Sequence, residues 1–121
     1  MNEFTAILRD AVGRVPKALG AIFVAWDGEP VSRFAPEMPA LDLEILGAQW
    51  GLVWSEVGRA LGRARLGNAI ELVVDVERGM VLIRQVSPQY YVVLAIAPGA
   101  HLATARRALE TAVASLRREM E

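Results

Sequence analysis

Apolar residues recur every three or four positions in three segments of the chain. This period places them on one face of a helix, and it predicts helices over residues 2–14, 41–64 and 100–118. At 1.5 Å per residue, the middle helix would be roughly 36 Å long, which is enough to cross a small sheet. The pattern therefore predicts one long central helix between two others.

Five further segments carry the pattern of strands. The first, 18–26, is almost continuously apolar, which is typical of a strand covered on both faces. Asp27-Gly28 follows it and favours a tight hairpin, because glycine accepts the positive φ that such a turn needs. Pro30 opens the return strand and lacks a hydrogen-bond donor, which indicates a strand at the sheet edge. The predicted strands are 18–26, 30–34, 70–76, 80–86 and 90–97.

The resulting order is helix, two strands, long helix, three strands, helix. The short connections favour antiparallel neighbours. The sequence thus predicts an α+β fold of two layers, in which one long crossover helix and two terminal helices pack on a five-stranded, mostly antiparallel sheet. The length of 121 residues suggests one domain spanning 1–121.

The hydrophobic fraction of 54% exceeds the usual average for soluble domains. No run of about 18 apolar residues occurs, so we expect no membrane insertion. The first residues lack the pattern of a signal peptide and cysteine is absent, so we expect the protein in the cytoplasm. The net charge of −1 argues against a nucleic-acid partner. The apolar surplus therefore points first to a protein–protein interface.

No reaction motif is present in the chain. His101 is the only histidine, and a lone histidine in the first turn of a helix is more often a surface or capping residue than a catalyst. No glycine-rich segment matches a phosphate-binding loop or a dinucleotide fingerprint. We expect a protein that is not an enzyme, with no catalytic, cofactor or metal site.

The long helix carries three stripes of residues along its surface. A broad apolar stripe is expected to pack on the protein's own sheet. Its members are Leu43, Leu46, Trp50, Val53, Trp54, Val57, Leu61 and Ala64.

A second apolar stripe lies nearly opposite the first. It consists of Leu41, Ile45, Ala48 and Leu52, where a helix with one buried face should be polar. The stripe could tuck under the loop 36–39, but we favour contact with another chain, because a row of large exposed apolar residues usually marks an interface.

The third stripe consists of small residues. Each glycine inside a helix costs about 0.8–1 kcal/mol relative to alanine, so four of them require a compensating gain. Close packing against the domain's own loops is one explanation, and we favour close approach of a helix from another subunit. The stripe comprises Gly47, Gly51, Ser55, Gly58 and Gly62.

The segment 70–76 is expected to form the other edge of the sheet, where an unprotected strand can pair with another chain. Glu71 and Asp75 could blunt that tendency, or could face solvent while the edge still pairs; the sequence leaves both open. For a dimer or partner interface we predict the helix residues Leu41, Ile45, Ala48, Gly51, Leu52 and Ser55 and the strand residues Glu71, Val73 and Asp75. Within this set we assign Ile45, Gly51, Leu52, Ser55, Glu71 and Val73 to the homodimer.

Nearly the whole chain resembles the Roadblock/dynein-light-chain domain family, including its bacterial MglB-like members. The element order matches, and so do several apolar and turn segments. These are Leu19-Gly20-Ala21-Ile22-Phe23-Val24, Asp27-Gly28-Glu29-Pro30-Val31, Ile70-Glu71-Leu72-Val73-Val74-Asp75, Gly79-Met80-Val81-Leu82-Ile83-Arg84 and Tyr91-Val92-Val93-Leu94-Ala95-Ile96.

The resemblance implies a long helix that crosses the sheet and a third strand at its edge. It also implies a homodimer built by pairing these edges and packing the long helices together. Family members bind small Ras-like GTPases, and MglB-like members stimulate GTP hydrolysis by positioning the GTPase's own catalytic groups. The leading hypothesis is thus a dimeric, non-enzymatic GTPase regulator. A homodimeric adaptor without a GTPase and a small-ligand sensory domain are the alternatives.

Overall fold

The computed structural model describes residues 2–121, so Met1 of the predicted domain 1–121 lies outside the described residues. The predicted order of helices and strands is confirmed. The elements are α1 (Glu3–Gly13), β1 (Ala18–Ala25), β2 (Pro30–Phe34), α2 (Ala40–Arg63), β3 (Glu71–Val76), β4 (Gly79–Ser87), β5 (Tyr90–Ile96) and α3 (Leu102–Glu119).

The five strands form one sheet in the order β2-β1-β5-β4-β3, and every neighbouring pair is antiparallel. Val93 of β5 lies opposite Ile22 of β1 on one side and Ile83 of β4 on the other. The two edge strands are β2, which begins with Pro30, and β3, as predicted. The α+β class and the antiparallel sheet are therefore confirmed.

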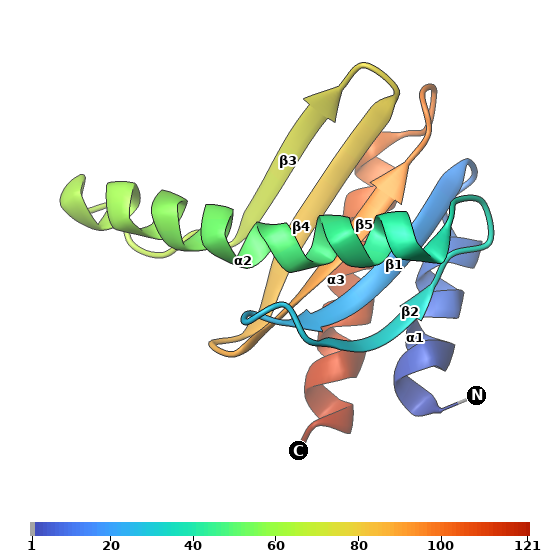
Figure 1. Cartoon of the computed structure of the whole chain (residues 1–121), viewed down its shortest axis with the longest axis horizontal. Helices are drawn as coiled ribbons and strands as arrows, with labels where there is room; N and C mark the ends of the chain where they lie inside the picture. Colours follow the sequence, from blue (N-terminus) through green and yellow to red (C-terminus); the bar gives the residue numbers. More distant parts are fainter. Residues whose placement is uncertain (1) are drawn as a thin grey trace.

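Helices cover both faces of this sheet (Figure 1). α2 crosses one face, while α1 and α3 lie side by side behind the other. The sheet is thus the middle of three layers, where the sequence suggested two. The physical reason is that the inner strands are apolar on both faces, and each face must be removed from water.

Two separate clusters of buried side chains result. Because successive strand residues point to opposite faces, Phe23 packs with Leu8 of α1 and Leu109 of α3. Its neighbour Ile22 packs with Leu43 of α2 on the other face. The core under α1 and α3 is the larger of the two, and the core under α2 extends along that helix only as far as Trp54.

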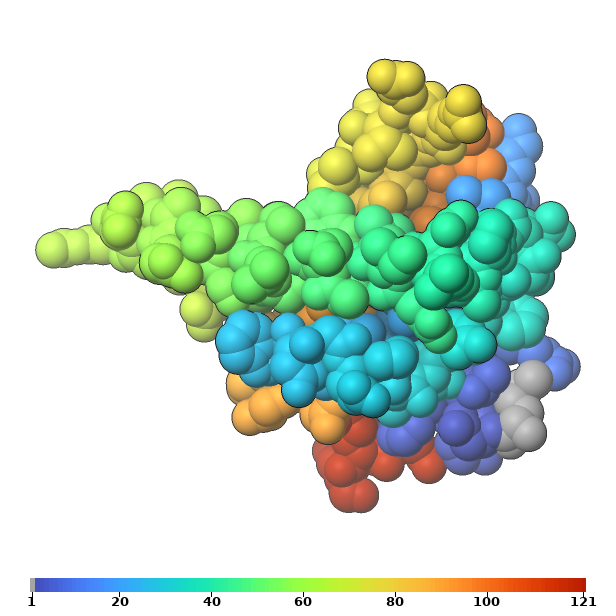
Figure 2. All heavy atoms as spheres, in the orientation of Figure 1, coloured from blue at the N-terminus to red at the C-terminus, as the bar shows by residue number. Residues whose placement is uncertain are grey.

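The C-terminal end of α2 extends past the edge of the sheet (Figures 1 and 2). We call residues 57–63 of α2 the arm. A β-carbon added at Gly58 or Gly62 in the arm would meet no heavy atom within 4 Å, and Leu66 just beyond it is 75% exposed. The arm therefore lies outside the packed part of the fold, and its surface is available for contact.

Candidate interaction surface

The face of α2 that touches the sheet contains two of the glycines. Gly47 and Gly51 are buried together with Leu43. A β-carbon at Gly47 would lie 3.2 Å from Cγ2 of Ile22, and one at Gly51 would overlap the carbonyl oxygen of Trp26. The expectation that these glycines admit a helix from another subunit is therefore corrected. They admit the chain's own sheet, which was the alternative explanation, and Gly51 is removed from the predicted dimer contacts.

The broad apolar stripe follows the prediction in its first half and departs from it near its end. Leu46, Trp50 and Trp54 pack partly buried against the cluster under α2. Val53 is 39% exposed and Ala64 is exposed, because the helix is leaving the sheet at that point. The apolar residues keep their helical spacing through the arm, but the sheet on which they would pack ends before it.

The two flanks of α2 face different hairpins. On one flank, Ala48 lies against Gly28 of the β1–β2 turn, and Glu44 forms an ion pair of 2.7 Å with Arg33 of β2. At about 100° per residue, Leu46 and Val53 fall on the other flank, toward β4 and β3. Figure 2 shows α2 as a ridge between the β1–β2 hairpin and the β3–β4 hairpin. The helix thus offers two distinct contact surfaces.

Four of the predicted interface residues line the outside of α2. We call Leu41, Ile45, Ala48 and Leu52 the outer row. The exposed fractions are 64% for Leu41, 54% for Ile45 and 68% for Leu52, and Ala48 is also exposed. The loop at 36–39 therefore does not cover the row, so this alternative is excluded. Leu41, Ala48 and Leu52 all fall on the side of α2 that faces the β1–β2 hairpin.

The predicted residues of β3 lie on the opposite face of the sheet from α2. Leu72 and Val74 join the cluster under α2. Glu71, Val73 and Asp75 alternate with them and therefore point toward the layer of α1 and α3. The structure does not bring these three side chains together with the helix residues of the predicted interface.

Glu71 is occupied within its own chain. Its side chain is only 12% exposed, and its carboxylate forms ion pairs of 3.2 Å with Arg84 of β4 and 2.6 Å with Arg106 of α3. Glu71 therefore neither faces solvent nor protects the sheet edge against pairing, which were the two alternatives that the sequence left open. Instead, Glu71 fastens the edge strand to α3.

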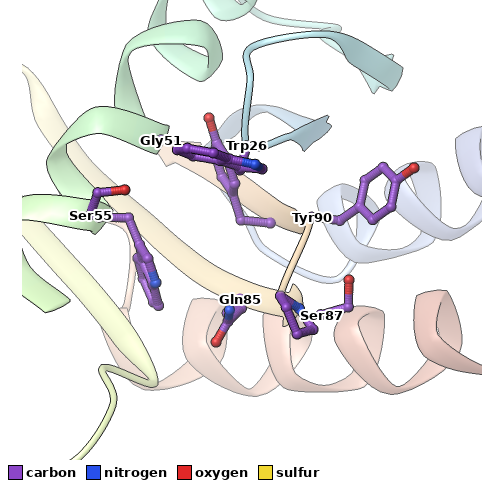
Figure 3. A pocket seen from close by; sticks show the side chains of 9 residues that line it. Trp26, Gly51, Ser55, Gln85, Ser87 and Tyr90 are labelled. Carbon is purple, nitrogen blue, oxygen red and sulfur yellow. The ribbon is translucent and has the colours of Figure 1, made fainter.

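A hollow between α2, the end of β1 and the β4–β5 turn was not predicted. Its volume is about 230 Å³. In Figure 3, Trp26, Ser55 and Gln85 surround it, while the ring of Tyr90 points away. Ser55, a predicted interface residue, thus lies at this hollow beside Gly51. The remaining lining residues are Trp54, Ser87, Pro88 and Tyr91.

Tyr91 forms part of the wall of the hollow nearest to α2. Its hydroxyl donates a hydrogen bond to the carbonyl oxygen of Gly47. Burial raises the pKa of Tyr91 above its ordinary value; the backbone N–H of Gly51 opposes this rise, and the negative charge of Asp27 adds to it. The hydroxyl proton is therefore held against the helix and is not offered to the hollow.

Two structural findings bear on other kinds of site. Within residues 2–121, no three histidine, aspartate or glutamate side chains come together as a metal-binding group. No helix in the same part of the chain is long and apolar enough to span a bilayer.

Comparisons with known proteins rest on structure alone, because no family model and no curated protein matches the chain. A Roadblock/LC7 domain from Streptomyces avermitilis superposes with a TM-score of 0.86 at 17% identity, covering 96% of each chain. MglB in a tetrameric arrangement superposes with a TM-score of 0.85 at 15% identity, and the match covers 98% of this chain and 90% of that chain. MglC from Myxococcus xanthus superposes with a TM-score of 0.67 at 26% identity, and the match covers 96% of this chain and 98% of that chain. The resemblance found in the sequence is therefore confirmed in three dimensions: this chain has the Roadblock/LC7 fold that MglB proteins share.

Proposed function

We propose that this protein is a homodimeric, non-enzymatic regulator of a small Ras-like GTPase. The observation that carries the proposal is the outer row of α2, where large apolar side chains stand in solvent without a covering element. Such a row is stabilised when another protein removes it from water. Resemblance to MglB-like proteins supports a GTPase as that other protein.

Three features support self-association through β3. β3 is an edge strand, so its outer backbone groups have no neighbouring strand. Leu72 and Val74 lie on the α2 side of the sheet and are only partly buried. The arm of α2 extends past the sheet (Figure 1). A twofold axis beside β3 would pair the two edges and lay each arm over the partner's β3 and β4, which makes the contact self-complementary.

This arrangement divides the predicted interface residues between two partners. Val53 and Leu46 lie on the flank that faces β3, so we assign them to the dimer. Leu52 lies on the other flank, so we reassign it, with Ile45 and the rest of the outer row, to the GTPase. Glu71, Val73 and Asp75 contribute to the dimer only through their backbone.

The similar protein MglB has a solved structure with a tetrameric arrangement, which agrees with self-association in proteins of this fold. A dimer without a GTPase, acting as an adaptor, would use the same surfaces. A small-ligand sensor is less well supported, because ligand sites are usually enclosed cavities with convergent polar groups. The hollow at Ser55 has only about 230 Å³, and the wider one of about 490 Å³ beside Leu46 and Val53 lies open on the outside of α2 and is mostly apolar.

An affinity capture tests the proposal. The immobilised protein is exposed to cytosol of its source organism with either a non-hydrolysable GTP analogue or GDP. We expect a small GTPase to be retained by the wild type, mainly with the GTP analogue, and to be lost from Leu52→Arg. The purified GTPase is then assayed for hydrolysis with and without the protein. Absence of any GTPase in both nucleotide states would leave the adaptor as the function.

A further inference from the structure

The hollow lies on the flank of α2 that faces the β1–β2 hairpin, away from the proposed dimer edge. Gly51 and Ser55 form its helical wall, and both lie on the same flank as Ala48 and Leu52 of the outer row. Its volume of about 230 Å³ accommodates one large side chain. A protein bound to the outer row would therefore reach the hollow with a single residue.

The walls of the hollow are held by ordered backbone. The N–H of Trp26 donates to the carbonyl of Gln89 over 2.9 Å, which joins the end of β1 to the β4–β5 turn. The N–H of Ala25 donates to Glu29 over 2.9 Å, which closes the β1–β2 hairpin. Trp26 is nevertheless 53% exposed. A large aromatic side chain that is open to solvent on a hydrogen-bonded stretch of backbone is typical of an anchor point for a partner.

The hollow contains hydrogen-bond acceptors that have no partner within the described residues 2–121. Tyr91 gives its proton to Gly47. The side chains of Ser55 and Gln85 make no hydrogen bond within residues 2–121, so their oxygens can accept one. Aromatic rings and free oxygens together suit a flat group that carries several N–H donors.

The charge around the hollow is complementary to a cation. No lysine or arginine lines it. Asp27 directly follows Trp26, and its carboxylate is close enough to act on Tyr91. Arg117 of α3 donates to the carbonyl oxygens of Val86 at 2.7 Å and Gln85 at 3.5 Å, so its guanidinium lies against the backbone of β4 and is not among the residues that line the hollow. A positive group in the hollow would therefore meet the field of Asp27 and the π-faces of the tryptophans.

We propose that the hollow binds an arginine side chain of a protein partner, with the guanidinium stacked on Trp26 and donating to Ser55 and Gln85. Arginine fits better than lysine, because its flat guanidinium both stacks and presents fixed N–H donors. This inference extends the proposed function by giving the partner on the outer row a specific anchor. It does not require that the partner be a GTPase.

The test is a titration of the isotope-labelled full-length protein with the peptide acetyl-Gly-Arg-Gly-amide, followed by NMR. We expect saturable shifts of the indole N–H signals of Trp26 and Trp54 and of the Gln85 side-chain amide. The same peptide with citrulline, which keeps the shape and loses the charge, should bind roughly fivefold more weakly, equivalent to about 1 kcal/mol. Trp26→Ala should abolish the shifts at Trp54 and Gln85, while the rest of the spectrum should still be that of a folded protein.

A matched pair of variants isolates the charge effect. Asp27→Asn and Glu56→Gln each remove one exposed carboxylate, but Glu56 lies on the outside of α2 beside Arg59. Asp27→Asn should weaken the binding of the arginine peptide, and Glu56→Gln should leave that binding unchanged. Equal binding of citrulline or of a proline-rich peptide, equal effects of the two variants, or no saturable shift would overturn the assignment. The titration contains no GTPase, so its failure and that of the affinity capture are separate results.

Discussion

Gly51 of α2 lies directly against the main-chain carbonyl of Trp26 at the end of β1. A β-carbon at position 51 would overlap that oxygen, whereas a β-carbon at Gly58 would meet no heavy atom within 4 Å. Two glycines of the same stripe, two turns apart, thus have opposite surroundings. Gly51 is required by packing inside the fold, and Gly58 has no such requirement within it.

Substitution of these glycines by alanine should separate the two cases. Gly51→Ala should lower the free energy of unfolding by about 1–3 kcal/mol, because the helix must move away from β1. Gly58→Ala should raise it by up to about 1 kcal/mol through helix propensity. Urea unfolding at one fixed protein concentration measures both. Equal changes in the two variants would contradict the close approach at Gly51.

Neighbouring positions on α2 should separate the dimer from the partner surface. Val53 lies among the residues of the flank that faces β3, together with Leu46 and Trp50. Val53→Arg should therefore give a monomer in analytical ultracentrifugation, because each charge would be buried against the partner without a counter-ion. Leu52→Arg, on the other flank, is the control and should remain a dimer. A monomeric Leu52→Arg with a dimeric Val53→Arg would reverse the assignment of the two flanks.

Removal of the charge of Glu71 should loosen the edge strand. The carboxylate bridges Arg84 and Arg106, and the side chain is 12% exposed. Glu71→Gln should lower the free energy of unfolding by about 1–2 kcal/mol, a value reduced by the partial exposure of Arg106. Backbone amides of β3 should also exchange faster with deuterium. Glu110→Gln, which removes an exposed partner of the same Arg84, should cost no more than about 0.5 kcal/mol.

Tyr91 should make the fold less stable at alkaline pH. Burial raises its pKa in the folded state, so above about pH 10 the unfolded tyrosine loses its proton before the folded one does. The folded state then binds more protons than the unfolded state, and the free energy of unfolding falls as the pH rises. Urea unfolding between about pH 9 and pH 11 should show a shallower fall for Tyr91→Phe. Parallel curves for the two proteins would show that Tyr91 does not contribute.

The elements and sheet edges could be predicted from the sequence, because they depend on local periods and turns. Pro30 alone indicated one edge strand, and the long apolar period predicted α2. The role of Gly51 could not be predicted, since a glycine stripe is equally consistent with close approach of the chain's own sheet or of another helix. The identity of the neighbour depends on Trp26, which is distant in sequence.

Non-local contacts also hid Glu71 and the hollow. The partners of Glu71 come from β4 and α3, so the alternating pattern of β3 suggested only a solvent-facing charge. The hollow forms because Trp26, Ser55 and Gln85 come together from three separate segments. Their spacing along the chain does not indicate that they are neighbours in the fold. In contrast, the exposure of Leu41 and Leu52 followed directly from their position on the helix.

The arm of α2 has a consequence for how this protein responds to dilution. A few helical turns without tertiary contacts are marginal in water, because propagation barely offsets conformational entropy. In the proposed dimer, the second copy would order the arm. The helix content of the arm would therefore depend on the equilibrium between monomer and dimer. Far-ultraviolet circular dichroism would then decrease on dilution before the core unfolds. Such a protein would report its own concentration through the fraying of one helix end.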